Sequence, residues 1–109
     1  MSYNGYANYE TWCVNLWIDN QSAQQGWWAA EARRCYAEAE GNSNFSKSEV
    51  AVDMLADRLK DEHEDGASEA IGSMAFGNGV FGDLLRAALS EVDWREIATN
   101  LLEGVDDED

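Results

Sequence analysis

The feature that most constrains the fold is the spacing of apolar residues, which recur every three or four positions in a 109-residue chain without proline. Such spacing places apolar side chains on one face of an α-helix. No segment alternates apolar and polar residues convincingly over the length of a β-strand. The sequence therefore predicts an all-α fold, a compact single domain of five or six short helices over residues 1–104.

Capping residues place the expected ends of these helices. Asn8 is a suitable N-cap for the first helix. Ser or Asp followed three residues later by Glu or Gln forms a capping box, a pattern found at Ser22 with Gln25, Ser46 with Glu49 and Asp93 with Glu96. Asp65-Gly66 and Gly104 mark expected helix ends. The predicted helices cover residues 9–20, 22–40, 47–64, 84–91 and 94–103, with a less regular stretch over 67–82 in which Ser68 would cap a short helix through Met74.

The tryptophans and cysteines are expected to serve the core. Five tryptophans lie at helical core spacing, and each can bury about 150–250 Å² of surface. Cys13 and Cys35 lack the short paired spacing of a zinc or redox motif, so buried free thiols are favoured over a disulfide. Residues 105–109 are almost purely acidic and are predicted to form a disordered tail.

Charge restricts the classes of partner. Asp and Glu number 22 against 7 Lys and Arg, for a formal net charge of −15. Residues 61–109 hold fourteen of the acids and only two of the bases. Nucleic acids and anionic lipid surfaces would repel such a chain. Its electrostatic partners are basic surfaces, which commonly belong to proteins that themselves bind nucleic acid.

Sequence motifs for catalysis, metals and membranes are weak. His63 is the only histidine, and residues 61–66 share the acidic spacing of a calcium loop without its third and twelfth ligands. Residues 77–82 are glycine-rich but lack the Lys and Ser/Thr of a phosphate loop. We therefore expect no enzyme activity, cofactor or specific metal, although a loose cation site or a small enzyme using His63 stays as an alternative. The chain has no secretory signal and no apolar run of about 20 residues, so a cytoplasmic location is expected.

A row of carboxylates is the strongest functional pattern. Glu49, Asp53, Asp57 and Asp61 recur every four residues, which places them along one side of a helix at a rise of about 6 Å. A basic groove that evolved for phosphates could accept such a row. The alternative is an ordinary solvated helix face. Four further acids extend the row, namely Glu62, Glu64, Asp65 and Glu69.

Two segments carry a resemblance to a known group of proteins. They are residues 8–20, which contain NYETW and LWIDN, and residues 89–98, LSEVDWREIA. Together they resemble a family of small acidic, largely uncharacterised proteins encoded in phages, plasmids and prokaryotic genomes. Small acidic proteins encoded by mobile elements often look like host-defence antagonists, so the resemblance implies an anti-CRISPR or anti-restriction role. Both segments also read as core helices with their caps, which folding alone would require.

The leading hypothesis is a non-enzymatic inhibitor that mimics nucleic acid and occupies a basic groove on a host-defence protein, such as a CRISPR effector or a restriction-enzyme component. It would bind neither nucleic acid nor a membrane directly, and its oligomeric state stays open, a homodimer included. Its eight contact residues would be those of the row and its extension. The alternative is an adaptor or regulatory protein with an apolar contact surface, formed by Tyr3, Tyr6, Trp27, Met74, Phe76, Val80 and Phe81.

Overall fold

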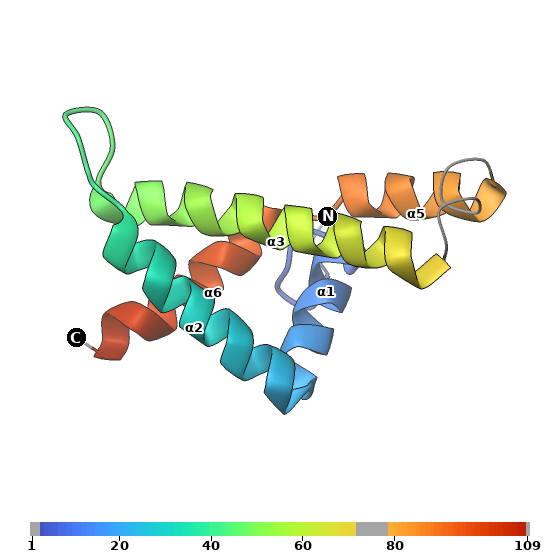
Figure 1. The fold of residues 1–109 in the computed structure, drawn as a ribbon, viewed down its shortest axis with the longest axis horizontal. Helices are drawn as coiled ribbons and strands as arrows, with labels where there is room; N and C mark the ends of the chain where they lie inside the picture. The colour runs from blue at the N-terminus through green and yellow to red at the C-terminus, as the bar shows by residue number, and fades with distance from the viewer. Residues whose placement is uncertain (1–2, 72–78, 109) are drawn as a thin grey trace.

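A computed structural model describes residues 3–71 and 79–108, leaving aside the side chains of residues 68, 70, 71 and 106–108. The described chain forms helices α1 (Tyr9–Asn20), α2 (Ser22–Glu38), α3 (Lys47–Ile71), α5 (Val80–Ser90) and α6 (Trp94–Glu108) (Figure 1). Outside these helices, an isolated antiparallel bridge joins Tyr3 and Tyr6 across a turn in which Asn4 and Gly5 have positive φ. The predicted all-α class is confirmed.

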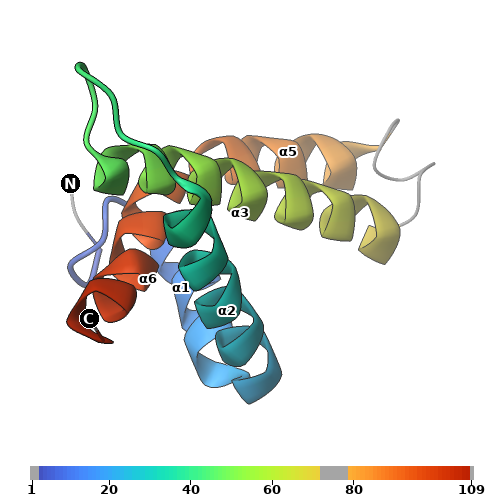
Figure 2. The same ribbon diagram turned by 60° about the vertical axis from the view of Figure 1, so that its left-hand side comes forward.

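The core lies where α2, α3 and α6 pack against one another, with α1 closing it against α2 and α6. Its largest fully buried side chains include Ile18, Leu55, Leu59 and Ile97. The molecule measures 45 × 29 × 27 Å, and its long dimension follows α3 (Figure 1). Figures 1 and 2 both show α5 alongside the C-terminal half of α3, its main contact, so this end of the molecule projects from the core.

Three of the predicted N-terminal caps are present. The Asn8 side chain accepts a hydrogen bond from the Thr11 backbone N–H at 2.9 Å. Ser46 and Glu49 form a reciprocal capping box at the start of α3, and the Asp93 carboxylate accepts from the Glu96 N–H at the start of α6. The cap predicted at Ser22 is wrong. Because α1 and α2 are separated only by Gln21, that residue is the N-cap and Ser22 already lies inside α2.

Two predicted helix ends are also wrong, because glycine does not stop either helix. α3 continues through Gly66 to Ile71, so Ser68 lies inside this helix and caps nothing. α6 continues through Gly104 to Glu108, and Val105 beyond the glycine is buried. A helical glycine costs about 1 kcal/mol relative to alanine. Continued backbone hydrogen bonding and packing offset that cost, so residues 105–108 of the expected tail belong to α6 and Asp109 lies outside the described residues.

The tryptophans divide between core and surface. Trp28 and Trp94 are buried as expected, whereas Trp17 and Trp27 leave 59% and 45% of their surface exposed. Cys13 and Cys35 are free thiols, and burial raises the pKa of the Cys35 thiol. Within the part of the chain that the structure describes, no helix is long and apolar enough to span a membrane.

Candidate protein-binding surfaces

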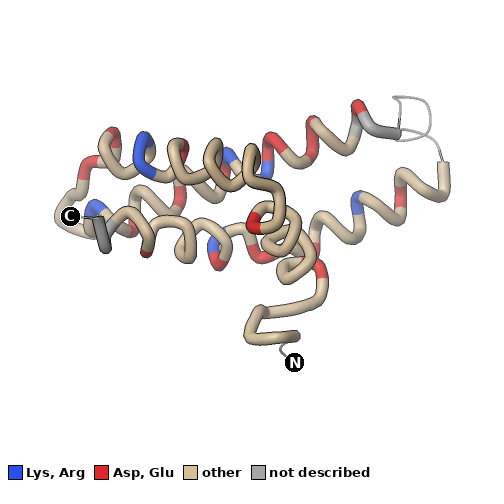
Figure 3. Tube along the Cα trace, turned by 90° about the horizontal axis from the view of Figure 1, so that it is seen from below, with Lys and Arg blue, Asp and Glu red and all other residues tan. Residues whose placement is uncertain are grey.

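The eight acids predicted as contact residues all lie on α3, and all eight are exposed. The longer helix makes the array more continuous than expected, because residues 49–69 now belong to one rigid element about 30 Å long. Acidic positions also occur on several other helices (Figure 3), so the negative charge is not confined to this side of the molecule. What distinguishes α3 is the close succession of carboxylates along a single helix.

Intramolecular contacts hold some of these acids. Asp53 pairs with Arg95 of α6, and Glu62 lies 3.8 Å from Arg58 one turn earlier on α3. The Glu49 carboxylate accepts from the Ser46 N–H in the capping box. The remaining acids form no ion pair with any described residue. Four of them make up what we name the outward group, namely Asp57, Asp61, Glu64 and Asp65.

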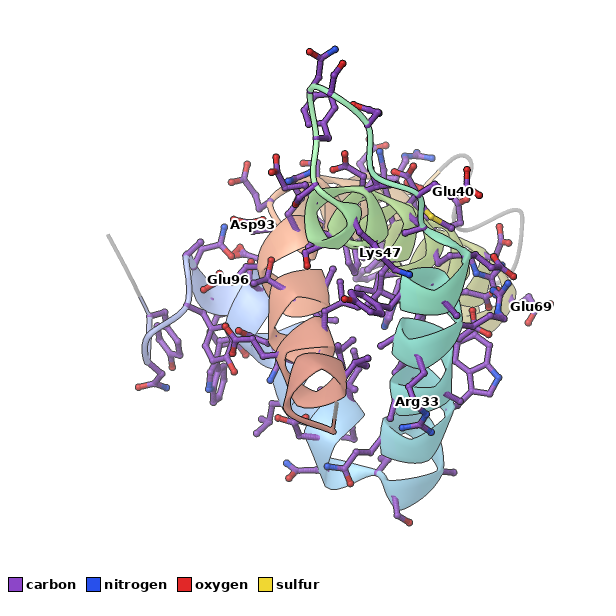
Figure 4. All side chains as sticks on the ribbon, turned by 90° about the vertical axis from the view of Figure 1, so that its left-hand side faces the viewer. Arg33, Glu40, Lys47, Glu69, Asp93 and Glu96 are labelled. Atoms are coloured by element: carbon purple, nitrogen blue, oxygen red, sulfur yellow. The ribbon has the colours of Figure 1, made fainter. Side chains whose placement is uncertain are left out.

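Because of helix geometry, the eight acidic side chains do not all lie on the same side of α3. Each step of four residues advances about 40° beyond a full turn, so a row that starts at Glu49 has turned through about half a circle by Glu69. The outward group lies on the exposed side of α3, and Glu64 at its edge borders a smaller pocket with Arg86, Leu89 and Trp94, toward α5 and α6. Glu62 and Glu69 lie on the side that turns toward α2, and Figure 4 shows Glu69 extending on the side of α2, opposite Asp93 and Glu96.

A carboxylate of α2 binds guanidinium groups of both α2 and α3. The Glu31 carboxylate lies 2.6 Å from Arg34 on its own helix and 3.3 Å from Arg58 on α3. The hydrogen bond from Arg34, aided by the nearby Arg58, lowers the pKa of Glu31 despite the opposing effect of burial. Through Glu31, these guanidinium groups stabilise the pairing of α2 with α3.

A cavity of about 700 Å³ opens between α2, α3 and α5, in the size range of ligand and side-chain binding pockets. We name it the α3–α5 groove. Mainly apolar side chains form it, with Glu62 and His63 as its ionisable groups. Its lining also includes Trp27, Trp28, Gly66, Leu85 and Leu89.

His63 is placed differently from expectation. The charged sequence around it predicts an exposed helix end, but the ring is half-buried between two indoles, 5.9 Å from Trp28 and 5.2 Å from Trp94 between ring centroids. Its Nδ1–H donates to the Leu59 carbonyl at 2.7 Å, which leaves Nε2 as the remaining polar atom of the ring. The spacing Leu55, Leu59, His63 already places this histidine on the inner side of α3, and that signal was available in the sequence.

The segment with calcium-loop spacing, residues 61–66, is α-helical, whereas a calcium loop needs non-helical backbone to bring its ligands together. Among the described residues, no group of three or more His, Cys, Asp or Glu side chains is arranged to hold a metal ion.

The expected apolar contact surface is dispersed over the molecule. Val80 and Phe81 of α5 and Trp27 of α2 are exposed near the α3–α5 groove. Tyr3 instead packs on Tyr9 and Trp12 at the other end of the chain, and the Tyr6 hydroxyl accepts from Asn15. Met74 and Phe76 lie outside the described residues.

The two segments that carried the sequence resemblance meet at one place, which we name the α1–α6 junction. The Thr11 hydroxyl donates to the Asn8 side chain at 2.6 Å and accepts from the Asp93 N–H at 2.8 Å. The Asn8 amide donates to the Glu91 carbonyl at 2.6 Å. Glu96 accepts from the Ala7 N–H at 2.9 Å, and Figure 4 labels Asp93 and Glu96 on this side of the molecule. The segments thus cap and join two helices that are about 80 residues apart in sequence.

Comparison with known proteins supplies a family without a described activity. No curated protein and no solved structure matches the chain. A family model covers residues 1–106, nearly the whole described length, and includes both segments of the α1–α6 junction. The chain belongs to this family, DUF7249, which is described as a family of unknown function.

Proposed function

We propose that the protein is a non-enzymatic inhibitor that binds a basic nucleic-acid-binding surface through the outward group of α3. Its target would be a host-defence protein in the cytoplasm, such as a CRISPR effector or a restriction-enzyme component. The acidic side chains would stand in for phosphates, so the inhibitor and the nucleic acid compete for one groove.

One observation carries this proposal: Asp57, Asp61, Glu64 and Asp65 are exposed on one helix and have no ion pair with the described residues. Like charges four residues apart destabilise a helix by about 0.2–0.5 kcal/mol per pair. Asp57, Asp61 and Asp65 form two such pairs in succession. A basic partner would neutralise these carboxylates, so the relief of their mutual repulsion would add to the free energy of binding.

The helix also fixes the spacing of these charges before any partner arrives. Preorganised groups avoid the ordering cost that a flexible acidic segment pays on binding. Exposed charges are screened by salt, so affinity should fall steeply as ionic strength rises. The same field would accelerate encounter with a basic surface.

The experiment measures inhibition directly. Purified CRISPR effectors and restriction endonucleases are tested for DNA cleavage with and without the protein, at several concentrations of competing duplex DNA. The test variant carries Asp57→Asn, Asp61→Asn and Asp65→Asn. The control carries Glu40→Gln, Glu91→Gln and Glu103→Gln, which remove the same charge from exposed positions outside α3.

We expect inhibition by the wild type and the control variant, loss of inhibition in the α3 variant, and relief by excess duplex DNA. Equal inhibition by both variants would show that total charge matters and the α3 array does not. Inhibition that duplex DNA leaves unchanged would place the contact outside the nucleic-acid groove and contradict mimicry.

A further inference from the structure

The apolar surface of the α3–α5 groove continues past its rim onto the exposed face of α5. Leu85 and Leu89 form part of the groove wall. Phe81 and Leu84 lie on the adjoining stripe of the same helix, with 73% and 62% of their surface exposed. Val80 at the helix start is exposed as well. Contiguous exposed apolar surface of this kind marks a binding site more often than a purely structural face.

The packing of α5 explains why this stripe is uncovered. α5 lies chiefly against α3, and the described residues provide no second helix packed against its other side. Figures 1 and 2 show α5 beside α3 at the end of the molecule that projects from the core. Leu85 and Leu89 line the open groove between α5 and α3, so among the described residues this side of α5 and the adjoining stripe have no helix packed on them.

The opposite wall adds an aromatic surface and acidic charge. Trp27 is half exposed where it borders the groove, and its ring contacts that of Trp28 at 4.6 Å between centroids. Glu62 forms part of the wall, and Glu69 lies two turns further along the same side of α3. Arg58 approaches this rim, but it is held by Glu31 and Glu62. The edge therefore favours positive charge on whatever enters.

Length and charge together identify the occupant. From Phe81 to Leu89 the rise of α5 is about 12 Å, which matches the 10–11 Å between the first and last contacts of a docked helix at positions i and i+7. A second copy of this chain would bring another net charge of −15 against the acidic half of the molecule. That repulsion disfavours self-association and favours a basic partner.

We propose that the α3–α5 groove binds a basic amphipathic helix of a partner protein, whose apolar side chains pack on Trp27, Leu84 and Leu85 while its Lys or Arg residues face Glu62 and Glu69. This site is separate from the outward group of α3 and does not rest on the inhibitory function proposed above.

The test uses the full chain and three synthetic 18-residue peptides. The first is an amphipathic helix of Leu and Lys, the second has Glu in place of Lys, and the third has the composition of the first in a scrambled order that forms no apolar face. Binding is measured by isothermal titration and by the fluorescence of the native tryptophans, at low and at physiological salt.

Two variants locate the contact. Phe81→Ser with Leu84→Ser removes the exposed stripe. Its control is Trp17→Ser, which removes a large apolar side chain of α1 that is also mostly exposed, at 59%. Glu62→Gln with Glu69→Gln removes the acidic edge, and its control is Glu40→Gln with Glu103→Gln. Circular dichroism and thermal unfolding check that every variant stays folded.

We expect the Leu/Lys helix to bind, the Leu/Glu helix not to bind, and the scrambled peptide to bind at least ~10-fold more weakly. The stripe variant should lose ~10-fold or more in affinity. The edge variant should lose ~3-fold at low salt, and both controls should stay within ~2-fold of the wild type.

Three results would overturn the proposal. Equal binding of the scrambled peptide would show that net charge attracts it without a groove. Unchanged affinity in the stripe variant would place the contact elsewhere. A wild-type dimer in sedimentation velocity that becomes monomeric in the stripe variant would show that a second copy covers this face. The DNA-cleavage inhibition described above should be unaffected by the stripe variant, so failure of one proposal is distinguishable from failure of the other.

Discussion

The α1–α6 junction and the α3–α5 groove lie in the same small protein but treat their side chains in opposite ways. At the junction, Thr11 is fully buried and both hydrogen-bonding roles of its hydroxyl are filled. At the groove, Phe81 and Leu84 are largely exposed, although they are among the more apolar residues of the chain. The first region is satisfied by contacts within the molecule, whereas among the described residues the second leaves large apolar side chains uncovered.

This difference distinguishes residues whose role in folding is evident from residues that are available for contact with a partner. Asn8, Thr11 and Asp93 cap helices and join distant segments, which accounts for them without any partner. Within residues 3–71 and 79–108, no comparable contact accounts for the exposed stripe on α5 or for the outward group on α3. Function is therefore best sought at the end of the molecule where α3 and α5 project from the core.

The largest expected effect comes from making the same Leu→Ala substitution in the buried core and on the exposed stripe. Leu59→Ala in the core should destabilise the protein by about 2–5 kcal/mol, because it opens a cavity among fully buried side chains. Leu84→Ala on the exposed stripe should change stability by no more than about 0.5 kcal/mol. Urea unfolding followed by tryptophan fluorescence measures both. Similar losses at the two positions would mean that the stripe is packed in solution and would break the comparison.

The junction itself is tested by removing one hydroxyl. Thr11→Val should cost about 1–3 kcal/mol, because the Asp93 N–H loses its acceptor in a buried site. Thr99→Val is the matched control on α6, where the exposed hydroxyl only bonds the Arg95 carbonyl one turn back, and it should cost less than about 0.5 kcal/mol. If both changes proved neutral in urea unfolding, the junction would contribute little to folding and its residues would need another explanation.

Glu31 supports the groove indirectly, because it pairs with Arg58, whose guanidinium lies over the ring of Trp27 at the groove edge. Glu31→Gln should cost about 1–2 kcal/mol at neutral pH through loss of hydrogen bonds to two guanidinium groups. The folded-state pKa of Glu31 lies below its ordinary value of about 4.5. Its contribution is therefore complete above about pH 4.5 and disappears as the pH falls through the folded-state pKa.

Thermal unfolding of the wild type and of Glu31→Gln across pH 3 to 7 measures the contribution of Glu31 to stability, because all other residues are the same in the two proteins. The gap between the two melting temperatures should close on acidification. A gap that stays constant down to about pH 3 would mean that the stabilisation does not come from the ionised Glu31 carboxylate binding Arg34 and Arg58.

The sequence predicted the helical class and most helix starts because those depend on local chemistry. Asn8, Ser46 and Asp93 each accept a hydrogen bond from a backbone N–H three residues away, so their neighbours in sequence are enough to identify them. The helix ends at Gly66 and Gly104 were wrong because glycine sets only a modest local cost. Packing outweighs it, as the burial of Val105 after Gly104 shows.

The candidate surfaces were predictable in part. The period of four assigned Glu49, Asp53, Asp57 and Asp61 to one helix, whereas Asp65 and Glu69 were expected beyond its end. The separation of Glu62 and Glu69 from the outward group depends on where α2 lies. The α3–α5 groove is built from three helices, and the place of His63 between Trp28 and Trp94 depends on tertiary contacts that sequence spacing does not encode. The pairing of Asp53 with Arg95 is likewise a contact between two helices.

The smallest expected effect concerns the helix that carries both surfaces. Gly66 lies inside α3, and a Cβ added there would meet no atom within 4 Å. Gly66→Ala should therefore stabilise the protein by about 0.4–1 kcal/mol by restricting the unfolded chain. Gly41→Ala is the opposite case, since its Cβ would lie 2.9 Å from the Lys47 backbone nitrogen, and it should destabilise. If Gly66→Ala lowered the melting temperature instead, α3 would end near residue 65 in solution, and the continuous array from Glu49 to Glu69 would be lost together with one wall of the groove.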